Sequence, residues 1–536
     1  FFLKMGRLPQ TFVAEAARYP RSDAAPFAYG TAGFRMLATE LASTAFRCGA
    51  LAAVRAIVTA QNTGLVLTAS HNPEPDNGVK LVDPNGGMLA IEWEAHAVAF
   101  ANATTEAEVA RLAEELLAAS PPPAGQAPAP RVLLARDTRP SGPALYDAAA
   151  CGVRAVLGPA GLTECGELTT PQLHYLVLAS NTGSEATEAA YYARLSGGFR
   201  ELVSGAPQAH AAKVVVDCAN GVGAGKLARL SAELGAAVFE AEVINAGPGG
   251  LNDGVGADFV QKERRLPGGA EGAAGSGRRC ASLDGDADRL VYWDDGDAAD
   301  QAVSPAAPPP LRVMDGDKIA TLIASELQAL LGAARLLPGA ADDEEKGEAL
   351  RVGVVQTAYA NGASTIHLRE ELGLEVAVAK TGVKHVHAKA EEFDVGVYFE
   401  ANGHGTALFS PRASAAIRDR AARGSEQAKA LCAMEQTLNP AVGDALSALL
   451  LVEAILRRRE WGLTEWAALY ADLPSRQLKV VVPDRTSVRV SEDETRALAP
   501  EGLQAAVDRA VAREAAPARA FVRPSGTEDV IRVYAE

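Results

Sequence analysis

Short apolar runs followed by polar turn residues recur along the chain and predict repeated strand–turn–helix units. Three such segments are RVLLARDTRPSG from Arg131, KVVVDCANGVGAG from Lys213 and RVGVVQTAYANGAS from Arg351. Each is followed by an Ala- and Leu-rich stretch with the spacing of a helix. A strand, a turn and a helix in this order are typical of α/β proteins, so the chain is predicted to contain three related α/β layers.

The pattern changes near Leu473, where strand-like runs surround one helical stretch and predict a fourth domain, of the α+β class. These runs are RQLKVVVPD, TSVRVS and ARAFVRPSGTEDVIRVYAE. Low-complexity stretches rich in Pro, Gly, Ala or charge are predicted to be exposed loops or linkers without chemistry: AASPPPAGQAPAP, LPGGAEGAAGSGRR, SPAAPPP and PGAADDEEKGEA. We therefore expect four domains, over residues 1–205, 206–310, 311–465 and 466–536.

The composition narrows the classes of partner. With 536 residues, of which 48% are hydrophobic, the chain is long enough for several domains with sizeable cores. Its 51 Lys and Arg against 67 Asp and Glu give a net charge of −16, which argues against nucleic acid or an anionic membrane as a partner. The six cysteines are scattered without a CxxC pair, as expected of free thiols in the cytoplasm.

No targeting or membrane segment is predicted. The first ten residues, FFLKMGRLPQ, lack the long apolar region of a secretory signal, and ALSALLLVEAIL is interrupted by Ser447 and Glu453. The first residue is Phe rather than Met, which is compatible with an incomplete gene product.

A serine and a histidine stand in a turn-rich segment directly after a predicted strand. LTASHNPEPDNGVK runs from Leu67 to Lys80, and the strand is predicted over Leu65–Leu67. Because strand ends often carry chemistry in α/β proteins, Ser70 is a candidate nucleophile exposed on a loop. For this segment alone, a turn in which Ser70 only bonds backbone is an equal alternative. No GxSxG elbow surrounds Ser70, which disfavours a hydrolase-type serine.

Three alternating aspartates in LDGDADRLVYW form a candidate metal site. On an extended backbone Asp284, Asp286 and Asp288 would point to one side, where they would repel one another unless they hold a divalent cation such as Mg²⁺. An EF-hand is excluded because its sixth position would be Arg289 rather than Gly and its twelfth Asp295 rather than Glu. A solvated acidic loop is the alternative, and strand-like sequence on both sides disfavours it.

The segment VYFEANGHGT carries side chains suited to a sugar. A strand predicted over Val395–Phe399 delivers Glu400, Asn402 and His404 on a glycine-rich turn. A carboxylate, an amide and an imidazole together offer the donors and acceptors that a polyol needs. Just upstream, KTGVKHVHAK adds Lys380, Lys384, His385 and His387, which form either a solvated basic face or one wall of a site for an anionic ligand.

The segment RPSGTED, between two strand-like runs, is suited to a phosphate group. Ser525, Gly526 and Thr527 can offer backbone N–H groups and two hydroxyls, and Arg523 adds a planar fork of donors. A simple turn is the alternative. Taken together, a nucleophile, a metal site, a sugar site and a phosphate site indicate phosphoryl transfer. Because each lies in a different predicted domain, we expect a cleft between domains.

These motifs resemble those of the α-D-phosphohexomutase superfamily, from YGTAGFR at Tyr29 to the last residue apart from the low-complexity inserts. The resemblance rests on TASHNPEPDNGVKLVDPNGGML, DGDADRLVYW, KTGVKHVHAKAEEFDVGVYFEANGHGT, DLPSRQLKV and FVRPSGTEDVIRVYAE. Two features are similar to the acetylglucosamine branch of the superfamily. They are the EANGHG turn and the order of the Ser70 loop before ARDTRPSG, which is reversed in most of the superfamily.

The resemblance implies three related α/β domains with mixed sheets, a C-terminal α+β domain and an active site in the central cleft. It implies one Mg²⁺ per site, held by Asp284, Asp286, Asp288 and a phosphate on Ser70. The implied catalytic residues are Ser70, Lys80, Arg35, His404 and Arg289. The implied substrate-binding residues are His71, Glu400, Asn402, Gly403, Lys384, His385, Arg523, Ser525, Gly526 and Thr527.

The expected activity is interconversion of N-acetylglucosamine 6-phosphate and 1-phosphate through a sugar 1,6-bisphosphate, which also serves as activator, in UDP-GlcNAc biosynthesis. A monomer or weak homo-oligomer is expected. The alternatives are a mutase for glucose or mannose phosphate, a metal-dependent phosphatase and a non-catalytic homologue, the last disfavoured by the intact motifs. The superfamily normally continues past RVYAE with a helix that covers the last sheet, whereas this chain stops at Glu536, so the fourth domain is expected to lack that helix.

Overall fold

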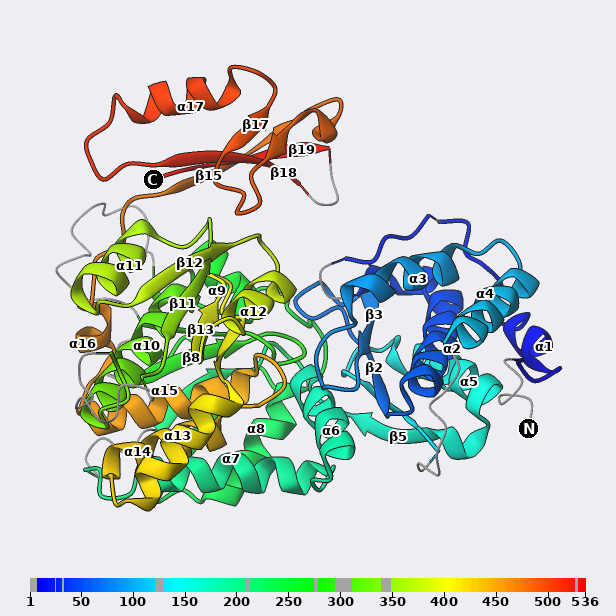
Figure 1. The fold of residues 1–536 in the computed structure, drawn as a ribbon, viewed down its shortest axis with the longest axis horizontal. Helices are drawn as coiled ribbons and strands as arrows, with labels where there is room; N and C mark the ends of the chain where they lie inside the picture. The colour runs from blue at the N-terminus through cyan, green and yellow to red at the C-terminus, as the bar shows by residue number, and fades with distance from the viewer. Residues whose placement is uncertain are drawn as a thin grey trace. The chain divides into compact units, whose positions relative to one another are not determined.

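The computed structural model describes residues 7–24, 26–30, 33–120, 129–207, 213–273, 278–294, 311–338, 349–525 and 529–536 (Figure 1). They fall into two compact units. The first unit draws on Phe1–Ser196, Ala212–Arg312 and Asn439–Ser447, and the second on Gly197–Ala211, Val313–Leu438 and Ala448–Glu536. Both units combine helices with sheets, as the sequence pattern predicts.

The first sheet of the first unit is mixed and has the strand order β1-β3-β2-β4-β5. Strand β3 runs antiparallel to β1 and β2, whereas β4 is parallel to β2 and β5. The strands are β1 (Phe34–Leu37), β2 (Thr63–Leu67), β3 (Asp76–Val82), β4 (Val132–Arg136) and β5 (Leu162–Glu167). The helices in this part of the chain are α1 (Phe12–Ala16), α2 (Ala42–Thr59), α3 (Ile91–Asn102), α4 (Glu106–Ala119), α5 (Gly142–Leu157) and α6 (Thr170–Thr182).

Strand β2 is buried along its whole length, which explains its continuous apolar sequence. It begins two residues before the strand predicted from the sequence and ends at the same residue, Leu67. The loop that carries Ser70 therefore starts directly at the carboxyl end of a buried strand and returns into β3.

The second sheet has the order β10-β9-β8-β6-β7. Strands β7 and β8 run parallel to β6, and β9 runs antiparallel to β8. The elements are β6 (Lys213–Asp217), α8 (Gly223–Leu234), β7 (Glu240–Ile244), α9 (Ala257–Glu263), β8 (Arg279–Leu283), β9 (Leu290–Asp294) and β10 (Arg312–Met314). The short connection between β8 and β9 is the aspartate segment.

The second unit contains a four-stranded sheet with the order β12-β11-β13-β14. Strands β12 and β13 are parallel to β11, and β14 closes the sheet antiparallel to β13. The elements here are α10 (Gly316–Ala333), β11 (Val352–Thr357), α11 (Gly362–Ile366), β12 (Glu375–Ala379), α12 (Val383–Ala390), β13 (Val395–Phe399), β14 (Gly405–Phe409), α13 (Pro411–Ala422), α14 (Glu426–Thr437) and α16 (Leu463–Ala467). Helices α7 (Glu188–Leu202) and α15 (Ala445–Arg459) each contain residues of both units.

The end of the chain forms the predicted α+β arrangement. An antiparallel sheet has the order β15-β19-β18, a two-stranded sheet pairs β16 with β17, and helix α17 contacts β17 and β18 (Figure 1). The elements are β15 (Arg476–Val481), β16 (Arg489–Val490), β17 (Ala497–Ala499), α17 (Leu503–Val511), β18 (Ala520–Pro524) and β19 (Val530–Ala535).

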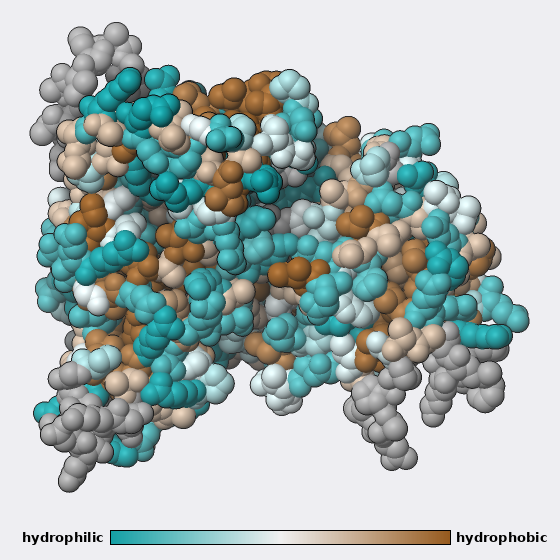
Figure 2. Space-filling model, turned by 45° about the horizontal axis from the view of Figure 1, so that its top comes forward, coloured by the Kyte–Doolittle hydropathy of each residue, from teal (hydrophilic) through white to brown (hydrophobic). Residues whose placement is uncertain are grey.

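The surface and the thiols agree with the composition. Hydrophilic residues cover much of the face drawn in Figure 2, with hydrophobic residues scattered among them. All six cysteines are free. Within the described ranges, no helix combines the length and apolarity needed to cross a bilayer.

Candidate active site

Ser70 lies in the turn after β2 with a left-handed backbone, φ 51°. Its Oγ accepts a hydrogen bond from Nη2 of Arg35 at 3.1 Å and donates one to Oδ2 of Asp286 at 3.1 Å. The side chain is fully buried, so the prediction of an exposed serine is wrong. The reason is that Arg35 and Asp286 enclose the hydroxyl.

Arg139 fixes the shape of the Ser70 loop. This buried residue follows β4, and its guanidinium donates to the backbone carbonyls of Ser70 at 3.0 Å, Asn72 at 2.8 Å, Pro73 at 2.7 Å and Asp76 at 2.8 Å. Four carbonyls tied to one planar fork leave the loop little freedom. The RDTRPSG segment thus has a structural task that its sequence did not reveal.

Two further side chains complete this support. Asp137 binds Nε of Arg139 at 3.1 Å and accepts the hydroxyl of Thr68 at 2.7 Å. From the connection between β7 and α9, Nδ2 of Asn252 donates to the carbonyl of Ser70 at 2.9 Å and to that of Asn72 at 3.0 Å. The loop is therefore held by donors that follow a strand of each sheet, which keeps Ser70 in its left-handed conformation.

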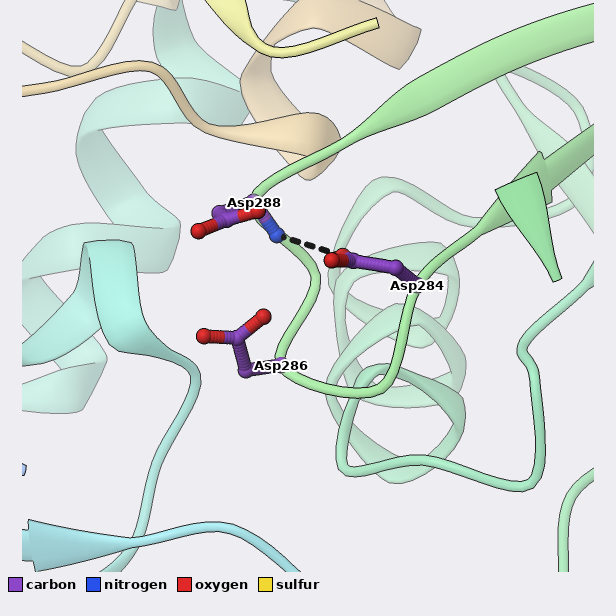
Figure 3. A group of neighbouring side chains, drawn as sticks. All are labelled: Asp284, Asp286 and Asp288. Carbon is purple, nitrogen blue, oxygen red and sulfur yellow. Dashed lines mark hydrogen bonds between the residues drawn. The ribbon is translucent and has the colours of Figure 1, made fainter. Parts of the chain in front are cut away.

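The three aspartates lie in the turn between β8 and β9 and face one another (Figure 3). One ligand oxygen from each lies within 4.8 Å of the others. The alternation of the aspartates predicted an extended backbone, and this prediction is wrong. Ala287 has φ 57°, and its N–H donates to the carbonyl of Asp284 at 3.1 Å. The turn closes further because the N–H of Asp288 donates to Oδ1 of Asp284 at 3.0 Å. The carboxylates thus converge through a tight turn rather than through the pleat of a strand.

The carboxylate of Asp286 contacts three side chains of the site. Its Oδ2 accepts from Nζ of Lys80 at 2.7 Å and from Oγ1 of Thr170 at 2.6 Å, in addition to Ser70 Oγ. Lys80 also lies 3.3 Å from Oδ2 of Asp288. The predicted nucleophile, basic residue and aspartates are therefore in direct contact.

The donor set fits a hard divalent cation. Oδ2 of Asp284 and Oδ1 of Asp286 are buried and accept no hydrogen bond from the part of the chain that the structure describes. Burial, together with Asp288 and Asp286, raises the pKa of Asp284 well above its usual range. A bound cation with oxygen ligands, such as Mg²⁺, would use these oxygens and offset the repulsion.

Arg289 and His71 adjoin this group. Nη1 of Arg289 donates to Oδ1 of Asp258 at 3.1 Å, and its Nε lies 3.9 Å from oxygens of both Asp284 and Asp288. Burial, followed by the positive charges of Arg289 and Arg35, lowers the pKa of His71 well below its usual value. His71 is therefore neutral near pH 7 and suited to hydrogen bonding rather than to carrying charge.

The predicted sugar residues form the turn between β13 and β14 in the second unit. Oε1 of Glu400 accepts from the backbone N–H of Gly382 at 3.1 Å, and Oδ1 of Asn402 accepts from the N–H of His404 at 2.9 Å. Gly403 supplies the left-handed position of the turn, with φ 89°. Lys384 and His385 lie half-buried in the first turn of α12, which directly follows Gly382.

The predicted phosphate residues lie at the end of β18 and beyond it. Nη1 of Arg523 lies 3.3 Å from Oε2 of Glu494, and its guanidinium is 5.7 Å from the ring centre of Tyr359. Ser525 is buried, and its N–H donates to the carbonyl of Val530 at 2.9 Å. Gly526 and Thr527 lie outside the described residues.

Sequence reasoning missed several side chains that contact the predicted site residues, among them Thr170, Asn252 and Glu494. Thr170 opens α6 behind a capping box formed by Thr169 and Gln172, which predicts a helix start but not a contact with Asp286. Neither Asn252 nor Glu494 stands in a motif with a known chemical meaning, so no signal in the sequence pointed to them.

Comparison with known proteins identifies the family. Family models match residues 31–108 as phosphoglucomutase/phosphomannomutase alpha/beta/alpha domain I, 181–291 and 315–461 as phosphoacetylglucosamine mutase AMG1 domains II and III, and 486–536 as the phosphoglucomutase/phosphomannomutase C-terminal domain. A phosphoacetylglucosamine mutase of Arabidopsis thaliana is 47% identical over 97% of this chain and 93% of its own length. The chain belongs to the phosphoacetylglucosamine mutase family.

Solved structures of this family have the same fold. The Aspergillus fumigatus N-acetylphosphoglucosamine mutase in complex with GlcNAc-6P and magnesium matches with a TM-score of 0.87 and 39% identity, over 100% of this chain and 95% of that chain. A serine-to-alanine variant of that mutase, in complex with glucose 1,6-bisphosphate, matches with a TM-score of 0.85, 39% identity and the same coverage. The expected superfamily and its acetylglucosamine branch are thereby confirmed.

Proposed function

We propose that this chain interconverts N-acetylglucosamine 6-phosphate and N-acetylglucosamine 1-phosphate, in UDP-GlcNAc biosynthesis. The observation that carries the proposal is the position of Ser70 Oγ, which contacts both Arg35 and a carboxylate of the aspartate group. A hydroxyl held between a guanidinium and a candidate metal site is well placed to carry a phosphoryl group. Family membership and the phosphosugar complexes of its relatives support this substrate class.

Asp284, Asp286 and Asp288, together with a phosphate on Ser70, would hold one Mg²⁺. When bound, the cation neutralises charge on the phosphoryl oxygens and orients them. Arg35 and Arg289 would supply further positive charge from the protein itself, and Lys80, which binds the same Asp286 oxygen as Ser70, would be the basic residue near the reacting hydroxyl. Catalysis then rests mainly on positioning and charge neutralisation.

The reaction consists of two phosphoryl transfers. In the first, the P–O bond to Ser70 breaks while a bond forms to the sugar 1-hydroxyl of N-acetylglucosamine 6-phosphate, which gives the 1,6-bisphosphate. The bisphosphate then reverses its orientation within the site, so that its 6-phosphoryl group faces Ser70. In the second transfer its 6-phosphoryl group returns to Ser70 and the 1-phosphate is released. Added sugar 1,6-bisphosphate activates the enzyme because it rephosphorylates Ser70.

The second unit would supply substrate recognition. Glu400 and Asn402 would bind the sugar hydroxyls. Gly403, Lys384 and His385 would also bind the substrate, and His404 would line the catalytic centre. Arg523, Ser525, Gly526 and Thr527 would bind the phosphate that does not react. We propose four domains, over residues 1–205, 206–310, 311–465 and 466–536, each of which supplies one of these groups.

The proposal also covers binding partners, location and oligomeric state. A negative net charge of −16 supports a protein that binds no nucleic acid and no anionic membrane. Six free thiols support a cytoplasmic location. We propose a monomer or weak homo-oligomer.

Phosphopeptide mapping of the purified protein tests the proposal. We expect a phosphate on the peptide that contains Ser70, and we expect Ser70→Ala to lose both the phosphate and the mutase activity. Ser184→Ala, which changes an exposed serine, is the control and should retain both. A fully active Ser70→Ala variant would overturn the mechanism.

A further inference from the structure

Glu494 is a buried carboxylate that contacts the predicted phosphate residue Arg523. It lies in the tight connection between β16 and β17, with φ 62° and only 5% of its surface exposed. Its Oε2 lies 3.3 Å from Nη1 of Arg523 and accepts the backbone N–H of Thr381 at 3.0 Å. One oxygen of Glu494 therefore serves two groups that are far apart in the sequence.

The contact links the phosphate residue to the predicted sugar residues. The N–H groups of Thr381 and Gly382 are neighbours in the chain, and they donate to Glu494 and Glu400 respectively. The segment before α12 is thus held between two carboxylates. Glu494 connects this segment to Arg523.

Two buried polar atoms near Glu494 lack a hydrogen-bond partner among the described residues. Nε of Arg523 and Oγ1 of Thr381 are buried and form no hydrogen bond with any residue of the described ranges. A single carboxylate therefore leaves part of the polar surface here without a partner. Buried polar atoms of this kind cost free energy unless another group, such as a ligand, satisfies them.

We infer that Glu494 competes with the phosphate group of the substrate for Arg523 and thereby sets the affinity for phosphosugars. The inference rests on the proposed role of Arg523 as the phosphate-binding residue. A guanidinium carries one positive charge, so a phosphate dianion and the Glu494 carboxylate cannot both be neutralised by it. Binding of phosphate displaces the carboxylate of Glu494 from Arg523, and the repulsion between the two anions weakens substrate binding.

Glu494→Gln separates the charge from the hydrogen bond. The amide oxygen of glutamine can still accept the N–H of Thr381, so the segment before α12 keeps its anchor, whereas the competing charge is gone. We expect the KM for N-acetylglucosamine 6-phosphate and the Ki of inorganic phosphate both to fall by about 3- to 10-fold, as expected for losing one partly screened ion pair.

Glu492→Gln is the matched control. Glu492 is exposed and lies two residues earlier in the same connection, and its change to Gln removes the same charge. Its KM and Ki should stay within about twofold of wild type, which excludes an effect of net charge alone. Glu494→Asp serves as a second variant, because its shorter side chain keeps the charge but reaches Arg523 less well. In Glu494→Asp we expect the KM and the Ki of phosphate to fall by less than in Glu494→Gln.

Arg523→Ala distinguishes the inference from the function on which it rests. If Arg523→Ala leaves the KM and the Ki of phosphate unchanged, Arg523 does not bind phosphate and the proposed role of that residue is wrong. If Arg523→Ala raises both constants, the role stands, and Glu494→Gln should then have no effect in the Arg523→Ala background. Unchanged or raised constants in both Glu494→Gln and Glu494→Asp, with an unchanged thermal midpoint, would overturn the competition.

Discussion

Asp286 connects three side chains of the site through one carboxylate oxygen. Its Oδ2 accepts hydrogen bonds from Ser70, Lys80 and Thr170, while Oδ1 accepts none from the described residues. Three donors on one oxygen fix the orientation of the carboxylate. Oδ1 is therefore held ready within the aspartate group, where a cation would bind it.

Thr170 is a positioning residue for this carboxylate, and Thr170→Val tests that role. The change keeps the shape of the side chain but removes the hydroxyl that donates to Asp286 at 2.6 Å. Partners that orient metal ligands are typically worth about 10- to 100-fold in metal affinity, so we expect Mg²⁺ binding, measured by calorimetry, to weaken by about 10-fold.

The effect should depend on the hydroxyl alone. Thr170→Ser should restore Mg²⁺ affinity, whereas a loss of only structural packing would not be rescued by the smaller serine. Thr182→Val, at the exposed far end of the same helix, should bind Mg²⁺ like wild type. Wild-type Mg²⁺ affinity in Thr170→Val would contradict the assigned role.

At the scale of elements, the loop between β2 and β3 owes its shape to contacts with two connecting segments, one after β4 and one after β7. Arg139, after β4, and Asn252, from the connection between β7 and α9, bind the same two carbonyls of the loop. The backbone of Ser70 is thus held by these two residues, while its hydroxyl contacts Arg35 and Asp286. A rigid support of this kind is what precise phosphoryl transfer requires.

Helix α10 shows how an element positions the sugar-binding turn. Asp315 caps the helix by accepting the N–H groups of Asp317 and Lys318 at 3.1 and 3.4 Å. The first residue, Gly316, lies so close to the carbonyl of Glu400 that a Cβ atom there would collide with it. The start of the helix therefore supports the turn directly and tolerates no side chain.

Two glycine-to-alanine changes in α10 should have opposite effects on stability. Gly316→Ala should destabilise the protein by about 1–3 kcal/mol, because the added methyl group forces the Glu400 turn to move. Gly332→Ala should be neutral or stabilising by up to about 1 kcal/mol, because alanine favours helices and the nearest atom, Cδ1 of Leu337, would be 3.7 Å from the new Cβ. Urea unfolding measures both, and equal effects of the two changes would refute the close contact.

Across the whole molecule, the sequence predicted the elements better than the contacts. Buried strands such as β11 and β13 are visible as apolar runs because both faces of the strand are covered. The aspartate turn was predicted as a metal site, but its conformation was not, since nothing in the sequence marks Ala287 as left-handed. The identity of the family was available only through resemblance, because physical reasoning alone reached no further than a phosphohexose.

The features of the site that the sequence did not predict are contacts between distant segments of the chain. Thr170 is 116 residues from Asp286, and Asn252 is 182 residues from Ser70. Single hydrogen bonds over such separations follow from how the two sheets pack, which periodicity does not reveal. The roles of Thr170 and Asn252 therefore became apparent only from the folded structure.

The central claim, that this chain is a mutase for N-acetylglucosamine phosphates, is tested most directly by ³¹P NMR. The purified protein, with Mg²⁺ and a catalytic amount of sugar 1,6-bisphosphate, is given the 1- and 6-phosphates of N-acetylglucosamine, glucose, mannose and glucosamine in turn. A site built for the acetamido group leaves polar groups unpaired with other sugars, so we expect N-acetylglucosamine 1-phosphate and 6-phosphate to interconvert fastest, with weaker activity on glucose phosphates. Faster turnover of glucose or mannose phosphate, or net release of inorganic phosphate, would contradict the assignment.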